Sequence, residues 1–367
     1  MTTSVSGAEL AADQAATQFA DKMLTALLGS METFGLFLGE RLGWLDALAG
    51  GPLTATELAE RTGTAECYAV ERLEMQAVYG NLTVVDHGPG PREQRRFGLE
   101  PGAAEVLADR HSLNYIGALP RIAAAVGRQI DDLVTAYRTG GGVSWAQLGA
   151  DARDSQAAAN RPWFESQLGP ALSSVAEVHD VLAVAGARIA DIGCGEGWST
   201  IALSLAYPDA DVTGIDIDEP SVATARVNAE AAGVADRVSF TLSDGGQLAE
   251  EHSFDAAFIF EALHDMPRPV EVLAAIRRAV RPEGAVVIMD EAVADEFTAP
   301  GDALEQAMYG YSILVCLPDS LSSPPSVGTG TVMRRSILTD YATRAGFAGV
   351  DALPIEGFSF FRFYRLR

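Results

Sequence analysis

The sequence predicts an α/β protein in which a mostly helical N-terminal domain precedes a doubly wound, mostly parallel sheet. Two observations support this fold class. Up to about residue 160 the apolar residues recur mainly at helical spacing, whereas from Ala187 onward short apolar runs alternate with helical stretches. The chain has 367 residues, of which 48% are apolar, and this is enough for two cores of ordinary size.

The N-terminal elements are expected in the order helix, turn, helix and hairpin, which is the winged-helix pattern. Thr54 and Glu57 have the spacing of a capping box, and Gly63 is suited to end the short helix that begins there. The expected elements, in chain order, are helices over 8–28 and 31–38 on either side of Gly29-Ser30, a helix from 54 to 63, a helix over 66–79, and strands over 82–86 and 96–99 joined by the turn-rich segment 87–91.

The charge of the chain argues against nucleic acid as a partner. Residues 1–160 contain 12 basic and 20 acidic side chains, and the whole chain has a net charge of -24. In the helix that would enter a DNA groove, 66–79, Arg72 is the only base, and Arg92, Arg95 and Arg96 in the hairpin form the only basic cluster. We therefore expect this domain to mediate dimerisation or to cover a substrate.

The C-terminal half alternates continuous apolar strands with helices, which is typical of a parallel sheet covered on both faces. Ligands of such sheets bind outside the carboxyl ends of the strands, so the loops after the strands should carry the chemistry. The expected parallel strands are 188–192, 211–215, 238–242, 255–260 and 285–289, and an antiparallel pair is expected over 347–353 and 358–365. The helices expected between the strands are 199–206, 221–232, 247–251 and 270–280. Further helices are expected before the sheet, within 112–139 and 152–184, on either side of Gly140-Gly141-Gly142.

The first of these loops lies between a strand and a helix and has a glycine at every second position. Gly193, Gly195 and Gly197 permit positive φ angles and let a ligand approach the backbone closely. The helix that follows presents free N–H groups in its first turn. Asp191 stands just before the loop, at the end of the strand.

Two further acids follow neighbouring strands. Asp216 lies about 20 residues past the glycine loop, where a carboxylate can accept both hydroxyls of a ribose. Alternatively, Asp216 caps the next helix. Asp244 follows the third strand, in the segment Ser243-Asp244-Gly245-Gly246.

The Gly-x-Gly-x-Gly spacing behind Asp191 resembles the first motif of class I S-adenosylmethionine-dependent methyltransferases, and four loops between Ala187 and Asp290 follow the order of that family. The resemblance implies a Rossmann-like sheet of seven strands, S-adenosyl-L-methionine as cofactor, S-adenosyl-L-homocysteine as product and a small-molecule acceptor. The two domains are similar to those of small-molecule O-methyltransferases and of actinobacterial methyltransferases labelled as regulators, which implies a homodimer. The residues implied to bind the cofactor are Asp191, Gly193, Gly195, Gly197, Asp216, Ile217, Asp244, Gly245, Phe260 and Glu261.

His264 is the candidate base for an acceptor hydroxyl, because it is the one histidine of five on a loop that faces the cofactor. The pair His264-Asp265 resembles the His-Asp or His-Asn pair of plant-type O-methyltransferases, although Met266 replaces the usual Trp. The resemblance implies that an acid after the fifth strand orients the ring, and Asp290, with Glu291 beside it, aligns best. Alternatively, His264 caps the following helix or bonds the backbone.

Other chemistries stay open at this point. In C- or N-methylation no hydroxyl base is needed. A winged-helix transcriptional regulator that kept the cofactor fold is a further alternative, and a nicotinamide oxidoreductase is another, because such enzymes use a similar glycine turn. Some C-methyltransferases of this build hold iron between a His-Asp pair and a later His. No histidine follows His264, and the three cysteines are far apart, so we expect no metal site.

The predicted organisation has three parts. Residues 1–110 form the winged-helix-like dimerisation domain, 111–185 a helical linker and lid, and 186–367 the methyltransferase domain. Residues 291–335 are too long for a plain connection and predict a second lid, with a helix over 303–315. The expected acceptor-binding residues are Trp163, Met308, Tyr309, Ile313 and Met333, although Trp163 could instead pack between domains.

The sequence also predicts where the protein works. No run of about 18 apolar residues exists, and Met1–Ala20 lacks the basic start and apolar centre of a secretory signal. Three cysteines suggest no disulfide framework. We expect a cytoplasmic protein with no membrane partner.

Overall fold

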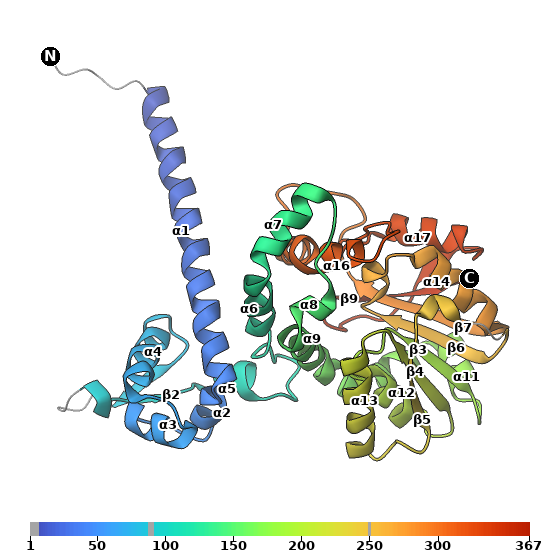
Figure 1. Ribbon diagram of the computed structural model, residues 1–367, viewed down its shortest axis with the longest axis horizontal. Helices are drawn as coiled ribbons and strands as arrows, with labels where there is room; N and C mark the ends of the chain where they lie inside the picture. Colours follow the sequence, from blue (N-terminus) through green and yellow to red (C-terminus); the bar gives the residue numbers. More distant parts are fainter. Residues whose placement is uncertain (1–6, 87–91, 249–250) are drawn as a thin grey trace. The chain divides into compact units, whose positions relative to one another are not determined.

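The computed structural model describes residues 7–86, 92–248 and 251–367 (Figure 1). The chain forms two compact units, Met1–Ala124 and Ala125–Arg367, and each is treated by itself below. The turn expected at 87–91, which includes His87, lies outside the described residues, as do residues 249 and 250 of the helix expected over 247–251.

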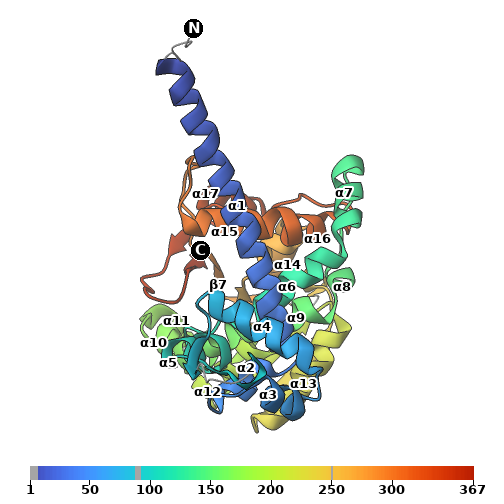
Figure 2. The same cartoon turned by 90° about the vertical axis from the view of Figure 1, so that its left-hand side faces the viewer.

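The first unit begins with α1 (Gly7–Arg41), one uninterrupted helix in both Figure 1 and Figure 2. The expected break at Gly29-Ser30 is therefore wrong. A glycine inside a helix costs only about 1 kcal/mol relative to alanine, which a long helix tolerates. The Ser30 hydroxyl donates a hydrogen bond to the Ala26 carbonyl, 2.9 Å away, so this polar side chain is satisfied within the helix.

The remaining elements of this unit match the expected order. Thr54 and Glu57 form the predicted capping box, and Gly63 ends that helix at a φ of 67°. The core is formed by Trp44, Leu58 and other apolar side chains of these elements. The elements are α2 (Trp44–Ala49), α3 (Ala55–Thr62), α4 (Glu66–Val78), β1 (Thr83–Asp86), which pairs antiparallel with β2 (Arg96–Gly98), a 3-10 turn (Arg92–Gln94) and α5 (Pro101–Ala108).

Several helices precede the main sheet. The helix expected from residue 112 begins only at Pro120, since proline fits the first turn of a helix but not its interior. Gly140 ends α7 at a φ of 75°, as the glycine run predicts. The helices are α6 (Pro120–Arg128), α7 (Ile130–Thr139), α8 (Trp145–Leu148), α9 (Ala150–Trp163), a π-helical turn (Phe164–Leu168), α10 (Gly169–Ser173) and α11 (Ala176–Leu182).

The second unit contains the seven-stranded Rossmann-like sheet that the sequence predicts, with strand order β5-β4-β3-β6-β7-β9-β8. Neighbouring strands from β5 to β7 are parallel, and β9 is antiparallel to both of its neighbours. The strands are β3 (Arg188–Ile192), β4 (Asp211–Asp216), β5 (Val238–Leu242), β6 (Phe254–Phe260), β7 (Val280–Glu291), β8 (Val350–Ala352) and β9 (Phe361–Leu366).

Helices cover both faces of this sheet, and alternate strand residues face opposite cores. Ile189, Phe258 and Val287 contribute to one core, whereas Ala190 and Ile259 contribute to the other. Side chains of α11 and α12 pack in the first of these cores, and side chains of α14 and α17 pack in the second; the helices are labelled in Figure 1. The connecting helices are α12 (Trp198–Ala206), α13 (Glu219–Ala231), α14 (Pro269–Ala279) and α17 (Arg335–Arg344).

The helix expected over 247–251 is wrong in its described part. A 3-10 turn, Gly245–Gln247, occupies this connection instead. Two adjacent glycines disfavour an α-helix, and the Asp244 side chain accepts the Gly246 N–H to form a tight turn. The loop after β5 therefore stays close to the end of its strand.

The expected second lid contains α15 (Ala303–Tyr311), a π-helical turn (Ser312–Cys316) and α16 (Leu317–Leu321). The helix predicted over 303–315 is thus confirmed and runs further than expected. Arg334 makes two hydrogen bonds to the carboxylate of Glu305, at 3.0 and 2.9 Å, and so joins α15 to the start of α17. The Glu305 carboxylate also accepts the Ala294 N–H.

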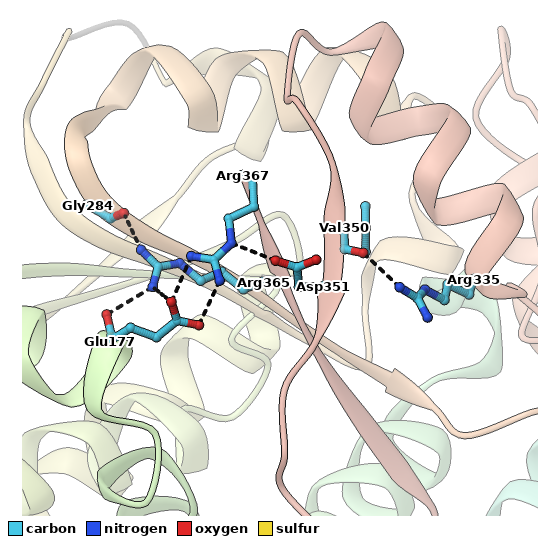
Figure 3. A network of polar contacts seen from close by, with 7 residues as sticks. All are labelled: Glu177, Gly284, Arg335, Val350, Asp351, Arg365 and Arg367. Carbon is cyan, nitrogen blue, oxygen red and sulfur yellow. Dashed lines mark hydrogen bonds and ion pairs between the residues drawn. The ribbon is translucent and has the colours of Figure 1, made fainter.

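Arginines at the end of β9 join this strand to its neighbours (Figure 3). Arg365 and Arg367 both bind Glu177 of α11, and Arg367 also pairs with Asp351 of β8 at 2.8 Å. Arg335 donates to the Val350 carbonyl. Since these side chains are partly exposed, we expect each ion pair to stabilise the edge of the sheet by about 1 kcal/mol or less.

Among the described helices, none combines the length and the apolar character that crossing a bilayer requires.

Candidate functional site

The glycine loop connects β3 to α12 and contacts the loop that follows β6. Gly193, Gly195 and Gly197 have φ angles of 76°, 52° and 83°, which confirms the need for glycine. A Cβ on Gly193 would lie 2.7 Å from the Cβ of Ala262, so the two loops are in close contact. A Cβ on Gly195 would meet nothing within 4 Å. The backbone at Gly195 therefore borders open space that a ligand can fill.

Asp191 is fully buried beneath this loop. One carboxylate oxygen accepts hydrogen bonds from the hydroxyls of Ser199 and Thr200 in α12, each at 2.6 Å, whereas Oδ1 has no partner in the described structure. Burial raises the pKa of Asp191 to about 6. The side chain thus fixes the start of α12 relative to β3 and positions the glycine loop.

Asp216 connects the loops after β3 and β4. Its carboxylate accepts the Gly195 N–H and the Asp218 N–H, both at 2.8 Å, and burial raises its pKa. Asp218, and not Asp216, caps α13 by accepting the Ser221 N–H. The helix-capping alternative for Asp216 is therefore wrong, and its carboxylate stays directed toward the glycine loop.

Asp244 follows β5, and Ile217 follows the neighbouring strand β4. Asp244 accepts the Gly246 N–H and forms an ion pair of 3.0 Å with Arg268, a partner that the sequence analysis missed. Gly245 packs so closely on Ile192 that a Cβ would approach its Cγ2 to 2.6 Å. Ile217, after β4, is 71% exposed, which leaves an apolar surface beside the acids.

Phe260 and Glu261 at the end of β6 differ in their surroundings. The Phe260 ring, at the end of β6, is buried in the core and stacks on Phe258 with 5.3 Å between ring centroids. Glu261 has a φ of 51°, an unusual conformation for a residue other than glycine. Its two oxygens accept hydrogen bonds from Gln156 at 2.9 Å and Asn160 at 2.6 Å, and burial raises its pKa to about 7.

Helix α9 contacts three of these loops, and the sequence analysis did not foresee this. Besides binding Glu261, it places Arg153 3.5 Å from Asp218 and the Arg161 guanidinium 3.9 Å from the Trp198 ring centroid. The segment thus borders the loops after β3, β4 and β6. In the sequence, the polar residues of α9 indicate only a solvent-exposed helix face, because the residues that they bind are distant in the chain.

His264 is buried, with 2% of its surface exposed, in a short turn after β6. Its Nδ1 lies 3.0 and 3.2 Å from the two carboxylate oxygens of Asp290 at the end of β7. Glu291 is 3.4 Å from the same nitrogen, and Asp265 is 3.5 Å from Nε2. The ring therefore does not cap α14, whose first residues have no side-chain cap.

The charges around His264 favour its protonated form. Burial alone would lower the pKa of His264, but the carboxylates of Glu291, Asp290 and Asp265 raise it well above its usual value. Burial raises the pKa of Glu291 well above its usual value, whereas the nearby imidazolium lowers the pKa of Asp290 despite its burial. A bound cation next to the ring would lower the pKa of His264 again.

The five expected acceptor-binding residues do not share one environment. Trp163 packs on Phe358, with 5.6 Å between ring centroids, against the core below the sheet. Met333 is buried in the core on the other face, and Met308 is buried in α15. Tyr309 and Ile313 are exposed. The sequence analysis missed Tyr311, whose pKa is raised by burial and by the Glu261 charge.

The basic cluster of the hairpin in the first unit is neutralised by its own acids. Arg92 binds Glu71 and Glu74, and Arg95 also binds Glu74. Arg96 pairs with Glu57. Groups already bound to carboxylates gain little from phosphates, so this surface does not favour the regulator alternative.

The arrangement of the second unit is that of a class I methyltransferase domain, and comparisons with known proteins agree. Residues 183–317 match the methyltransferase domain family. The 27-O-demethylrifamycin SV methyltransferase of Amycolatopsis mediterranei is 40% identical over 107 residues, which are 29% of this chain and 39% of that protein. The chain thus spans less than half the length of the curated relatives it matches. These matches support the methyltransferase interpretation of the glycine loop over the nicotinamide alternative.

Solved structures extend the likeness to the whole chain. The mitomycin 7-O-methyltransferase has a TM-score of 0.73 at 22% identity, covering 98% of this chain and 99% of its own. Human N-acetylserotonin methyltransferase, solved with S-adenosylmethionine, has a TM-score of 0.68 at 17% identity, covering 100% and 99%. The chain therefore has the two-domain fold of these O-methyltransferases, with a methyltransferase domain in its C-terminal half.

Replacing Asp191 by Asn should change how stability depends on pH. The folded pKa of about 6 exceeds the ordinary 3.8, so the folded state binds this proton more tightly than the unfolded state. Stability from this group is present below the folded pKa and is lost as pH rises through it. Urea unfolding of the wild type should show a loss of about 1 kcal/mol from this group between about pH 5 and 7, which D191N lacks.

The control is Asp236→Asn, since the side chain of Asp236 is 79% exposed. A difference between D191N and the wild type that is the same at both pH values would contradict the buried, proton-binding environment of Asp191.

Proposed function

We propose that this protein transfers a methyl group from S-adenosyl-L-methionine to a hydroxyl group of a small molecule, with His264 as the base. The observation that carries the proposal is the meeting of two loops. The loop that holds the buried His264 begins at the end of β6, and its Ala262 is in close contact with Gly193 of the glycine loop. A base and a cofactor-binding backbone are therefore neighbours.

The residues present fit an adenosyl cofactor. The backbone at Gly195 borders open space, and the Asp216 carboxylate, fixed by two N–H groups, can accept ribose hydroxyls with its remaining lone pairs. Ile217 offers an apolar surface, and Asp244 offers an acceptor for an amino group. The match to the methyltransferase domain family and the cofactor complex of the human structural neighbour support this assignment.

When bound, the cofactor supplies a methyl group activated by a positively charged sulfur. The chain then has to align the acceptor and take up the hydroxyl proton. Because the nearby carboxylates favour the protonated ring, His264 acts as a base only in its neutral form, after Nε2 has released its proton to solvent. In that form Asp290 accepts the Nδ1–H, which leaves Nε2 as the proton acceptor. The Asp290 carboxylate then stabilises the imidazolium that forms.

The acceptor class follows from the surroundings of the base. The Glu261 charge raises the pKa of Tyr311 in addition to burial, and the His264 charge acts on Glu261, so an aromatic ring and hydrogen-bonding groups surround the base. The curated relative and the mitomycin enzyme are named for O-methylation of natural products. We therefore assign a hydroxylated aromatic metabolite to this chain, with the reaction taking place in the cytoplasm, where its three free cysteines would stay reduced.

Replacing Asp216 by Asn should weaken the binding of S-adenosyl-L-homocysteine by about 10- to 100-fold, because hydrogen bonds to a charged acceptor contribute about 1.5–3 kcal/mol. Calorimetric titration of the full chain measures the affinity. Asp211→Asn, at the exposed start of the same strand, is the matched control and should bind like the wild type. An affinity of D216N within about twofold of the wild type would sink the ribose assignment.

Replacing His264 by Ala should lower kcat for a phenolic acceptor by at least about 100-fold, the usual contribution of a general base. A panel of phenols and hydroxyquinones with labelled S-adenosyl-L-methionine gives the rates. Binding of S-adenosyl-L-homocysteine should be retained, and the exposed His111→Ala serves as control. Turnover that survives in H264A would instead favour methylation at carbon or nitrogen, where no hydroxyl proton has to be removed.

We also propose that the protein is a homodimer that associates through α1. An apolar stripe runs along this helix, and its side chains are 43–62% exposed in the single chain. Large exposed apolar patches on a folded protein mark interaction sites, and a self-complementary stripe suits a second copy of the same helix. The stripe consists of Phe19, Met23, Leu24, Leu27, Leu28, Met31, Phe34 and Leu38.

Introducing charge into the stripe should separate the dimer. The double variant Leu27→Glu and Met31→Glu places two carboxylates in the interface, whereas Thr25→Glu places one on the opposite side of the helix. Light scattering after size-exclusion chromatography should give the mass of one chain for the double variant and of two chains for T25E and the wild type. A wild type that elutes as a single chain at micromolar concentration would exclude the dimer.

A further inference from the structure

A thiol that is distant in the sequence lies beside the candidate base. Cys316 ends the π-helical turn of the lid segment and is 8% exposed. Its Sγ, one ring nitrogen of His264 and a carboxylate oxygen of Asp265 all lie within 4.8 Å of one another.

The separation of these atoms fits one ion between them. Nε2 of His264 and Oδ1 of Asp265 are 3.5 Å apart, too far for a good hydrogen bond. Two ligands of a tetrahedral Zn²⁺ ion, at bond lengths near 2.1 Å, lie about 3.4 Å apart. Moreover, Oδ1 of Asp265 is buried and has no hydrogen-bond partner in the described structure. A buried carboxylate oxygen without a partner is costly unless something binds it.

The surroundings of His264 are those of a metal-binding imidazole. Asp290 accepts the Nδ1–H at 3.0 Å, and such a carboxylate fixes the ring and leaves Nε2 to bind the ion. Nitrogen, carboxylate oxygen and thiolate together suit Zn²⁺ and similar transition ions rather than Mg²⁺ or Ca²⁺. The π-helical turn that ends at Cys316 is a feature often found at functional sites.

We infer that Nε2 of His264, Oδ1 of Asp265 and Sγ of Cys316 form a binding site for a divalent transition ion of the zinc type. Binding replaces the S–H bond of Cys316 with a metal–sulfur bond and releases that proton to solvent. A fourth position stays open for water. The ion also takes the Nε2 lone pair, so it prevents His264 from accepting a proton and stops methyl transfer. This effect on turnover rests on the proposed function, whereas the binding itself does not.

The test uses the full chain, stripped of metal with a chelator and titrated with Co²⁺ as a spectroscopic probe. Coordination by a thiolate should give a near-ultraviolet charge-transfer band that saturates at one ion per chain. The band should be lost in Cys316→Ser and kept in Cys67→Ser, which removes an exposed thiol of the first unit. Zn²⁺ affinity, measured by calorimetry, should fall at least about tenfold in both C316S and Asp265→Asn.

Circular dichroism and thermal unfolding establish that each variant is folded before it is titrated. A wild type without the charge-transfer band, or a band that persists in C316S, overturns the site. The inhibitory role is overturned if Zn²⁺ binds at Cys316 but one equivalent does not slow turnover. It is also overturned if chelation does not restore turnover that Zn²⁺ has slowed. A metal-free chain that never methylates any acceptor refutes the proposed function, and the cobalt spectrum still decides the site.

Discussion

The hydrogen bond from the Gly195 N–H to the Asp216 carboxylate joins the ends of two neighbouring strands, and the geometry of the whole site depends on that junction. It exists because β4 lies directly beside β3, whereas on the other side of β3, toward β6, the strand order reverses. Asp191 below holds α12 in place, and Ala262 closes the other side against Gly193. Small changes in any one loop would therefore move the others.

The parts of the fold that depend on local pattern could be predicted from the sequence. The glycine spacing and the apolar runs located the loop and the parallel strands, and the Pro- and Gly-rich segments located the ends of helices. Local pattern also explains why Phe258 and Phe260 share one core, because residues two apart in a strand lie on the same face. The continuity of α1 was missed because one glycine is a weak helix breaker in a long helix.

The rest of the site comes from contacts between residues far apart in the chain, which no local pattern reveals. Gln156 and Asn160 reach Glu261 across about 100 residues, and Arg268 pairs with Asp244. Cys316 comes beside His264 only because a π-helical turn shifts the helical register within the lid segment. Sequence spacing could therefore name the catalytic candidates but not the side chains that surround them.

Glu261 shows how α9 and the sheet are mechanically linked. The Glu261 backbone is in the left-handed region, which costs a residue other than glycine roughly 1–2 kcal/mol. Such a conformation persists only while the surrounding structure holds it. Here the amides of Gln156 and Asn160 do so. If α9 withdraws, the peptide at 261 is free to relax, and the turn bearing His264, three residues further on, swings with it. Loss of the α9 contacts and displacement of His264 would then be a single event.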